Sequence, residues 1–554
     1  APYNVADWTV TYGANSITIK YNSVPALPVH NITQNTYFNI LQDAINAAVA
    51  NDVIEIADLT LTGQVSNVNK SLTIQGTSGG NSTLAGSAVG VGLTIAASNI
   101  IIKDLRIQNY VEAVRFATNQ SNVTLQNLVV TSNSTYGVNF TSGIVSNVII
   151  SGSELSSSGV GLKMGTNASI DGLNINNSTI KNNVEGISVA NASAGVDALN
   201  NVSITNTTFE NNSRKGIYVE KLSNATFDNI IVNNCGIDPA YGSNSGIDLN
   251  LKYDDFVNIT ITNSTITNSG ATGTSLYPGG RPAMSFSVRD DAPSYNSNPA
   301  TLDGFTFSNN TVSVPNHMMA FESVAGPANA LVNNNDLSVL VSGKYAIINT
   351  GHSDINLTCN WHGTADYNDI QPTLAATGTG DIIVNTFSTD DTYASCIGPV
   401  TNTNTNIDYA TIQAAINDPL TLNGHTIVVQ SGTYNEQVNV TKSLTILGPN
   451  NAISPNTGSR VAEAVMVNLP AGRAFTIKSG NTDVTISGFK FDGGSPIHDA
   501  NETNFPKTSD VTFSKNLVIN ANNIFAGTNT SWADLIITDN KFQDINAVAN
   551  VSAI

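Results

Sequence analysis

The sequence predicts an all-β solenoid: a right-handed parallel β-helix arranged as two tandem modules, each opened by an N-terminal capping helix. Three observations carry this prediction. A turn motif of the form apolar-x-Asn-x-Thr-apolar recurs about every 25 residues, short stretches of alternating apolar residues precede it, and one phrase of nine residues occurs twice. A period of this length is typical of folds in which stacked units share one continuous core.

The turn motif sets the period of the repeat. Clear copies are "INNSTI", "ITNTTF", "ITNSTI" and "FSNNTV", and looser copies are "LQNLVV", "ISGSEL" and "FDNIIV". Their first residues stand at 125, 150, 175, 204, 227, 261 and 307, so the steps are 25, 25, 29, 23, 34 and 46. Period-two alternation before each copy predicts a strand. The phrases "GVNF", "GLKM", "GISV", "GIYV" and "GIDL" predict a further short strand, which makes about three strands per coil.

The asparagine of the motif falls where the chain must turn a corner. Asparagine tolerates the left-handed backbone conformation, and glycine accepts it freely. Stacked coils lie ~4.8 Å apart, so equivalent side-chain amides can bond from coil to coil. The residues of this predicted ladder are Asn127, Asn177, Asn206, Asn229 and Asn263. The alternative is a β-sandwich with Asn-rich turns, but the regular step favours the β-helix.

A duplicated segment predicts a structural beginning that is used twice. "VNKSLTIQG" at 68–76 returns as "VTKSLTILG" at 440–448, and the helix-like phrase "LQDAIN" at 41–46 returns as "IQAAIN" at 412–417. The offsets, 442−70 = 372 and 412−41 = 371, are nearly equal. An amphipathic helix would cover the open end of a first coil, whose strand edges are otherwise unpaired.

These features divide the chain into four parts. Residues 1–34 are a leading β segment or the tail of a preceding module, and residues 35–398 form the first β-helix, with an insertion at 270–300. Residues 399–406 read as a linker, and 407–554 as a second β-helix that is incomplete. The chain is therefore expected to be a piece of something longer.

The composition of the chain restricts its expected binding partners and its expected cellular location. Charged residues make up only 11% of the chain and the formal net charge is −19, which disfavours nucleic acid and anionic membranes as partners. No apolar run approaches the ~20 residues of a membrane helix. Low charge with abundant Asn, Thr, Ser and Gly predicts an extracellular or cell-surface protein. Cys359 and Cys396 are a candidate disulfide, and the alternative is three unpaired thiols that include Cys235.

The segment "YATIQAAIN…HTIVVQSGTYNEQVNVTKSLTILGPN" at 409–450 resembles the N-terminal part of the pectin-lyase-like β-helix superfamily. The duplicated head and "NLTCNWHGTAD" at 356–366 resemble, more narrowly, long repetitive surface proteins of bacteria that use a type IX export route. The resemblance implies a β-helix over nearly the whole chain. It leaves function open, because this fold carries lyases, hydrolases, esterases, epimerases and adhesins.

Catalytic motifs of these enzymes are incomplete. "GTYNE" at 432–436 matches pectinesterases, but the carboxylate strand that should follow it is missing, and dipeptides typical of polygalacturonases occur in the wrong order. The 22 Lys and Arg residues are scattered, with few in the coils of 120–270. No catalytic residue is therefore predicted.

Only the insertion at 270–300 is expected to hold a cluster of side chains suited to ligand binding. Aromatic rings and Arg–carboxylate groups suit sugar binding. The candidate ligand contacts are Tyr277, Arg281, Arg289, Asp290, Asp291 and Tyr295. The alternative is a structural loop with Arg289 paired locally. Asp254 and Asp255 lie in the neighbouring long step, and paired aspartates also fit calcium, although the metal is unknown and no other cofactor is predicted.

The leading functional prediction is a secreted or surface-attached scaffold, such as a component of a rod, stalk or filament, with adhesive faces. The alternative is a polysaccharide-binding or polysaccharide-degrading β-helix enzyme, a lyase or hydrolase, that uses the 270–300 insertion. Extracellular polysaccharide or a second copy of the chain is the expected partner.

Overall fold

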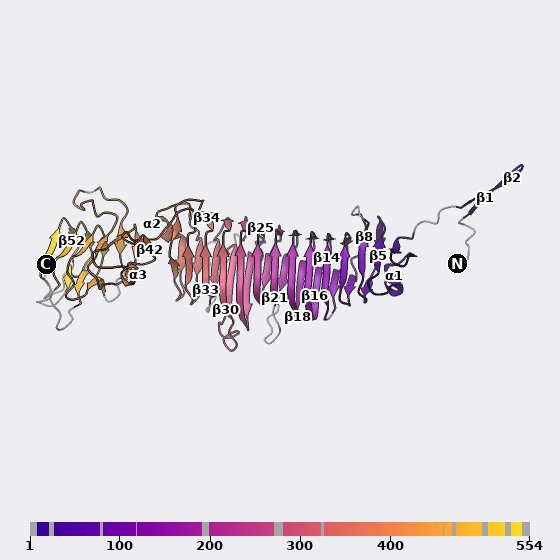
Figure 1. Ribbon diagram of the computed structural model, residues 1–554, viewed down its shortest axis with the longest axis horizontal. Coiled ribbons are helices and arrows are strands. Elements are labelled where there is room, and N and C mark those ends of the chain that lie inside the picture. The colour runs from indigo at the N-terminus through magenta and orange to yellow at the C-terminus, as the bar shows by residue number, and fades with distance from the viewer. Residues whose placement is uncertain are drawn as a thin grey trace. The chain divides into compact units, whose positions relative to one another are not determined.

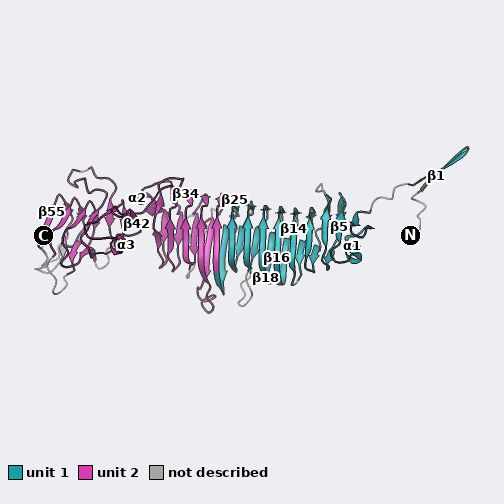
Figure 2. Ribbon diagram, viewed as in Figure 1, with its two compact units in different colours: residues 1–256 teal, residues 257–554 magenta. Residues whose placement is uncertain are grey.

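A computed structural model describes residues 8–21, 27–77, 81–117, 119–190, 199–270, 281–322, 326–457, 459–467, 472–500, 508–526 and 533–545. The chain forms two compact units, residues 1–256 and 257–554 (Figure 2). Strands make up nearly all of the regular structure in both units (Figure 1), and every sheet of more than two strands is built mainly from parallel pairs. The prediction of a parallel β-helix is confirmed.

Each regular coil of the first unit contributes three strands. In one coil these are β12 (Arg106–Gln108), β13 (Glu112–Phe116) and β14 (Ser121–Gln126). β12 pairs in parallel with β15 (Val129–Thr131) of the next coil, and β13 and β14 both pair with the long strand β16 (Tyr136–Ser151). Residues at equivalent coil positions therefore lie directly beside one another, as the repeat predicts.

The other strands of this unit follow the same order. They are β5 (Val53–Ile56), β6 (Thr60–Thr62), β7 (Ser66–Val68), β8 (Thr73–Gly76), β9 (Thr83–Ala85), β10 (Val91–Ile95), β11 (Ile100–Lys103), β17 (Glu154–Ser156), β18 (Val160–Asn176), β19 (Thr179–Lys181), β20 (Glu185–Val189), β21 (Leu199–Thr205), β22 (Thr208–Glu210), β23 (Lys215–Val219), β24 (Leu222–Asp228), β25 (Ile231–Asn233) and β26 (Ser245–Lys252). An antiparallel hairpin of β1 (Trp8–Gly13) and β2 (Ser16–Tyr21) precedes them. β27 (Asp255–Thr262) spans the boundary between the units.

Alternate residues of each strand point into an apolar core. Burial of these side chains supplies most of the favourable free energy, at ~25 cal/mol per Å² of apolar surface. Phe116 and Phe140 stack at 4.3 Å between ring centroids in adjacent coils. Fully buried positions of four consecutive coils include Val123, Leu125, Val130, Val138, Val148, Ile150, Leu173, Ile175, Ile180, Val202 and Ile204.

The corners of the coils use left-handed residues, as expected. All five asparagines of the predicted ladder have positive φ, with values of 51° for Asn127, 48° for Asn177, 49° for Asn206, 53° for Asn229 and 52° for Asn263. Asn229 Nδ2 donates to Asn206 Oδ1 at 2.6 Å, whereas Asn127 donates to Asp104 and Asn177 donates to its neighbour Asn176.

A second set of asparagines bonds from coil to coil inside the fold. Asn310 Nδ2 donates to Asn335 Oδ1 at 3.1 Å, and Asn335 Nδ2 donates to Asn360 Oδ1 at 2.9 Å. Asn183 Nδ2 donates in the same way to Asn212 Oδ1 at 3.1 Å. These side chains are buried, with exposed fractions of at most 3%. Each of the five amides also donates to, or accepts from, a backbone group, so the polar atoms that turn inward are hydrogen-bonded.

Both copies of the duplicated segment fold alike. A hairpin of β3 (Val29–Asn31) and β4 (Thr36–Phe38) precedes α1 (Leu41–Ala47), and a hairpin of β41 (Val400–Asn402) and β42 (Ile407–Tyr409) precedes α3 (Ile412–Asn417). The apolar face of each helix is buried. That these helices act as caps stays a prediction.

The lysine of the repeated phrase binds the end of the helix in each copy. Lys70 Nζ donates to the backbone oxygens of Ile45, Asn46 and Ala48 at 3.0, 2.7 and 2.6 Å, at the C-terminal end of α1. Lys442 Nζ makes the corresponding bonds at the end of α3. A cation at this end satisfies unpaired carbonyls and favours the helix dipole, which explains why "KSLTI" occurs in both copies.

The second unit continues with coils and then begins a new set of sheets at β41. Its coils contain β28 (Thr265–Thr267), β29 (Met284–Arg289), β30 (Thr301–Ser308), β31 (Thr311–Ser313), β32 (Met319–Glu322), β33 (Ala328–Asn333), β34 (Asp336–Val339), β35 (Ile347–Asn349), β36 (Ile355–Thr358), β37 (Leu374–Ala376) and β38 (Ile382–Val384). The new sheets contain β43 (Thr426–Val429), β44 (Gly432–Tyr434), β45 (Val438–Val440), β46 (Thr445–Leu447), β47 (Ala464–Met466), β48 (Arg473–Ile477), β49 (Val484–Ser487), β50 (Lys490–Asp492), β51 (Ser495–Asp499), β52 (Val511–Ser514), β53 (Leu517–Ile519), β54 (Phe525–Ala526), β55 (Leu535–Thr538) and β56 (Lys541–Gln543).

α2 (Tyr367–Ile370) and a 3₁₀ turn at Gln371–Thr373 lie between β36 and β37 of the coils. The strands β39 (Phe387–Ser388) and β40 (Cys396–Ile397) lie between β38 and β41. Gln371 Nε2 donates to the backbone oxygen of Thr433, and the Thr433 N–H donates to Gln371 Oε1. That 399–406 is a linker between two modules stays a prediction.

Of the two interpretations of the cysteines, the structure agrees with the one that includes a disulfide. Cys359 and Cys396 form a disulfide, and Cys235 is a buried thiol outside it. Burial raises the pKa of Cys235 to about 11, so it stays protonated.

Candidate functional site

The described part of the 270–300 insertion brings three predicted contacts together. Arg289 Nε and Nη2 donate to the two carboxylate oxygens of Asp291 at 2.5 and 2.8 Å, and the Arg289 guanidinium lies 4.3 Å from the centroid of the Tyr295 ring. This bidentate pair satisfies two of the guanidinium donors within the loop itself. The local pairing of Arg289 is the feature that the structural-loop alternative predicts.

Of the other predicted contacts, Arg281 faces a different carboxylate. Arg281 Nη1 lies 3.4 Å from Glu322 Oε1, and Asp290 Oδ1 is buried without a hydrogen-bond partner among the described residues. Tyr277 falls outside the described residues. The six candidates therefore do not gather into one described cluster.

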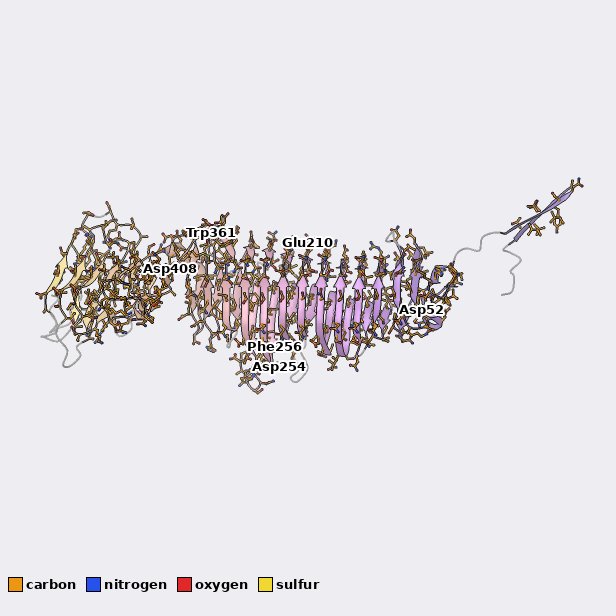
Figure 3. All side chains as sticks on the ribbon, in the orientation of Figure 1. Asp52, Glu210, Asp254, Phe256, Trp361 and Asp408 are labelled. Atoms are coloured by element: carbon orange, nitrogen blue, oxygen red, sulfur yellow. A yellow bond between two sulfur atoms is a disulfide. The ribbon has the colours of Figure 1, made fainter. Side chains whose placement is uncertain are left out.

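The aspartates that suggested calcium lie together at the start of β27. Asp254, labelled in Figure 3, has its carboxylate 3.8 Å from Lys221 Nζ, and Asp255 is exposed at the start of β27. Among the residues that the structure describes, no group of three or more His, Cys, Asp or Glu side chains is arranged to hold a metal ion.

Charged side chains instead lie close together on one face of the first unit. The strands β13, β16, β18, β20, β23 and β26 pair side by side and direct one column of side chains away from the core. We call these outward side chains, with their neighbours at both strand ends, the outer face. The column consists of Arg115, Asn139, Lys163, Ser188, Tyr218 and Asp248.

One end of the outer face is organised around Glu112. Arg115 Nε and Nη2 donate to its two carboxylate oxygens at 2.7 Å each, and Asn139 Nδ2 donates to Oε2 at 3.0 Å. Burial alone would raise the pKa of Glu112, but the hydrogen bonds from Arg115 and Asn139 outweigh it and lower this pKa. The Arg115 side chain remains 38% exposed, so it can still meet a ligand.

Lys163 lies in the middle of the outer face. Its Nζ donates to Ser188 Oγ at 3.1 Å. Burial lowers the pKa of Lys163, and the carboxylates of Glu185 and Glu220 partly counter this effect. Tyr218 lies two strands away in the same column, Tyr136 begins β16 in another column, and both are half-buried like Lys163 itself.

The other end is a network of buried ion pairs. Lys215 contacts Asp248, each side chain is only 4% exposed, and Lys215 Nζ lies 3.8 Å from the centroid of the Tyr218 ring. Glu220 Oε1 accepts hydrogen bonds from Tyr218 Oη and Lys252 Nζ, both at 2.5 Å. Burial, followed by the nearby carboxylates of Glu220 and Asp248, raises the pKa of Tyr218, so the phenol stays protonated.

The expectation that only residues 270–300 hold a cluster of side chains suited to ligand binding is wrong. Lys163, Lys215 and Lys252 lie far apart in the sequence but meet on one face because they occupy successive coils. The signal was present in "GVNF", "GLKM", "GISV", "GIYV" and "GIDL", in which the third letter of every phrase is the outward residue. Aligning these phrases as a column, rather than scanning for local clusters, would have found the face.

The "GTYNE" segment has a structural role. Glu436 accepts hydrogen bonds from the backbone N–H groups of Ile412 and Gln413, at 3.0 Å each, at the start of α3. In the first copy Gln64 accepts the corresponding bond from Leu41. Burial raises the pKa of Glu436, and the two N–H donors oppose this rise. Glu436 thus supports the start of the helix.

A comparison with known protein families agrees with the β-helix fold. Residues 89–251 match a family model described as "right handed beta helix region". No curated protein matches the chain. No described helix is long and apolar enough to cross a membrane.

Several solved structures resemble the chain at low sequence identity. A PL6 family alginate lyase, AlyGC, is 15% identical with a TM-score of 0.37, over 91% of this chain and 79% of that one. The A-module of the mannuronan C-5 epimerase AlgE4 of Azotobacter vinelandii is 14% identical with a TM-score of 0.38, over 62% and 91%. The catalytic unit of a GH87 alpha-1,3-glucanase of Streptomyces thermodiastaticus is 14% identical with a TM-score of 0.34, over 63% and 66%.

Proposed function

We propose that the chain is an extracellular polysaccharide-binding β-helix, and that its outer face takes a polymer bearing carboxylate groups. The observation that carries this proposal is the column in which half-buried Lys163 and Tyr218 stand two strands apart, with half-buried Tyr136 at the start of β16 and the partly exposed guanidinium of Arg115 at the end of the column. Aromatic rings offer apolar area to sugar rings, and Lys and Arg offer charge-assisted hydrogen bonds to uronate carboxylates.

The buried pairs next to this row support binding rather than cleavage. Lys215 is held by Asp248, and Glu220 is held by Tyr218 and Lys252, so these groups are committed to one another. A base must be free to take a proton in the transition state. The pairs instead fix the Tyr218 side chain from two sides, which lowers the entropy that a ligand must overcome.

The scaffold interpretation and this proposal require different parts of the same fold. Stacked parallel coils supply stiff support, and the outer face supplies the contact with the polymer. Adhesin and filament roles, and self-association, stay predictions. The chain's net charge of −19 acts mainly at long range, where salt of 0.15 M screens it beyond ~8 Å, so the local cations decide the contact.

Binding to polygalacturonate, alginate and uncharged dextran tests this proposal. Isothermal titration should show affinity for the two acidic polymers that falls as salt is raised. Lys163→Met keeps the side-chain stem and removes the charge, and we expect at least a ten-fold loss of affinity, because one charge-assisted bond is worth ~1.5–3 kcal/mol. Tyr218→Ala should weaken binding by a similar factor through loss of the ring.

Lys103→Met is the matched control. Lys103 lies in the same unit at the end of β11, outside the outer face, and should leave affinity unchanged. The proposal is refuted if the wild-type protein binds neither acidic polymer, or if Lys163→Met and Lys103→Met behave alike. Absorbance of unsaturated uronate products, followed in the same samples, should stay flat. A rise that Lys163→Met abolishes would replace binding by lyase activity.

A further inference from the structure

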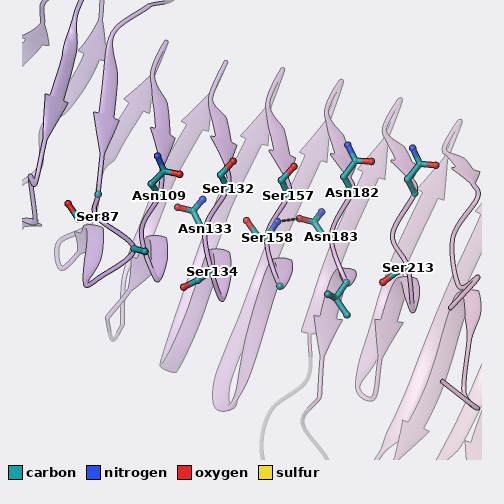
Figure 4. Close-up of a pocket in the computed structure, with 15 residues that line it drawn as sticks. Ser87, Asn109, Ser132, Asn133, Ser134, Ser157, Ser158, Asn182, Asn183 and Ser213 are labelled. Atoms are coloured by element: carbon teal, nitrogen blue, oxygen red, sulfur yellow. Dashed lines mark hydrogen bonds between the residues drawn. The ribbon is translucent and has the colours of Figure 1, made fainter. Parts of the chain in front are cut away.

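A groove follows one corner of the first unit, across the turns that lead from β12, β15, β17, β19 and β22 toward the strands of the outer face (Figure 4). Its volume is about 960 Å³. The residues that line it are Gly86, Ser87, Ala88, Asn109, Ser132, Asn133, Ser134, Ser157, Ser158, Gly159, Asn182, Asn183, Val184, Asn211 and Ser213. None of them is charged and none is aromatic, in contrast to the outer face.

One exposed polar residue per coil recurs along the groove. Asn109, Ser132, Ser157, Asn182 and Asn211 occupy the same corner position, with φ between 52° and 60°. Because stacked coils rise by ~4.8 Å, their amides and hydroxyls form an evenly spaced row. A row of this kind suits a chain-like ligand that repeats its own hydroxyl groups.

The buried ladder beneath the groove is interrupted at Ser158. Where the ladder is intact, Asn183 Nδ2 donates to Asn212 Oδ1 in the next coil and to the backbone oxygen of Leu155, both at 3.1 Å. Ser158 occupies the position between Asn133 and Asn183, and its shorter side chain donates to the backbone oxygen of Ser156.

This interruption leaves one buried donor without an acceptor. Asn133 is 1% exposed and lines the groove, and its Oδ1 accepts the Tyr110 N–H at 3.0 Å. Its Nδ2, however, has no hydrogen-bond partner among the described residues. An unsatisfied buried amide is unfavourable, so a ligand oxygen that reaches it above Ser158 would bind favourably. Figure 4 shows Asn133 beside Ser132, facing the gap toward Ser158.

From these observations we propose that the corner groove is a second polysaccharide site, specific for an uncharged, hydroxyl-rich glycan. Hydroxyl and ring oxygens of such a glycan accept from Asn133 Nδ2 and exchange hydrogen bonds with the exposed Asn and Ser row. The groove offers no cation to a uronate and no ring for stacking, so acidic polymers gain nothing there. This site uses residues that the outer face does not, so each can fail without the other.

Affinity electrophoresis in gels containing dextran, laminarin or hydroxyethyl cellulose tests the groove. The wild-type protein should be retarded by at least one of these uncharged polymers. Ser158→Asn should complete the ladder by giving Asn133 Nδ2 an acceptor and should fill the groove, and we expect at least a ten-fold loss of affinity with a thermal midpoint that is not lowered. In the intact ladder a Cβ on Gly161 would lie 3.1 Å from Asn183 Nδ2, and Gly137 holds the equivalent position in the preceding coil.

Two matched variants separate occlusion from a general surface effect. Val184 lines the groove and is 39% exposed, whereas Ile231 on β25 is 44% exposed and does not line it. Val184→Arg should abolish retardation and Ile231→Arg should preserve it. The inference is overturned if none of the three polymers retards the wild-type protein, or if Ser158→Asn or Val184→Arg is retarded as strongly as wild type. Lys163→Met should leave retardation unchanged, which distinguishes this site from the outer face.

Discussion

The buried asparagine ladder makes a quantitative prediction at Asn212. Its Oδ1 accepts from the backbone N–H and the Nδ2 of Asn183, at 3.1 Å each, and its Nδ2 donates to the backbone oxygen of Ile180 at 2.9 Å. Asn212 is 0% exposed. Substitution Asn212→Ala leaves two buried backbone groups without this partner, the Asn183 N–H and the Ile180 oxygen, while Asn183 Nδ2 keeps its bond to Leu155.

The expected loss follows from these two groups. Each unsatisfied buried group costs ~1–3 kcal/mol, so the free energy of local opening should fall by roughly 2–6 kcal/mol. Hydrogen exchange is the appropriate assay, because stacked coils need not unfold as one cooperative unit. Peptides covering 176–190 and 205–220 should exchange at least ~30-fold faster, since 1.4 kcal/mol corresponds to a factor of ten.

Asn200→Ala is the control for burial. Asn200 also has two side-chain partners, Asp171 and Asn224, at 3.3 and 3.0 Å, but these bonds are exposed. Water replaces exposed bonds, so the loss should stay within ~0.5 kcal/mol. If Asn212→Ala and Asn200→Ala accelerate exchange equally, the assignment of stability to the buried ladder fails.

Two further predictions concern the second unit. Lys442→Met removes two hydrogen bonds at the end of α3 and should lower the free energy of local opening there by ~1–3 kcal/mol, seen as faster hydrogen exchange of a peptide covering 410–420, whereas unchanged exchange would contradict the helix-end role. His362 has both ring nitrogens buried without a partner among the described residues, and burial lowers its pKa to about 4 from an ordinary 6.5. Because the unfolded state binds the proton more readily, stability should fall by up to ~3 kcal/mol as pH drops from 6.5 to 4 and should level off below 4. His362→Leu should flatten that slope and His352→Leu, at an exposed position, should not.

The coil architecture follows directly from the sequence, because its causes are local and repeated. Period-two alternation places Val123 and Leu125 inward, and Asn127 turns the corner with positive φ. The duplicated phrase predicts two similar heads, and the structure adds the physical reason in the contacts of Lys70 and Lys442 with helix carbonyls.

The spacing of the asparagines in the sequence does not distinguish the buried ladder from the exposed one. Asn177 and Asn183 both recur with the coil period, and both belong to Asn-rich turns. One lies outside with positive φ, whereas the other turns inward and is 3% exposed. Only the position of the backbone at the corner decides which amide faces the core, and that position is a tertiary property.

The candidate site was missed for a related reason. Local clusters such as "RDDAPSY" at 289–295 attract attention, yet charges adjacent in sequence neutralise one another, as Arg289 and Asp291 do. In a stacked fold, residues one coil apart are closer than their sequence separation implies. Lys163 and Tyr218 are 218−163 = 55 positions apart but only two strands apart on one sheet.

This geometry also separates the two proposed sites. The corner residues, such as Ser134, are followed directly by the strands of the outer face, such as β16 from Tyr136. A coil therefore presents an uncharged turn and a charged strand in succession, and stacking converts each into its own continuous surface. Substitutions within one column should consequently change affinity for one class of polymer only, because residues of a column share a surface whereas residues of a coil do not.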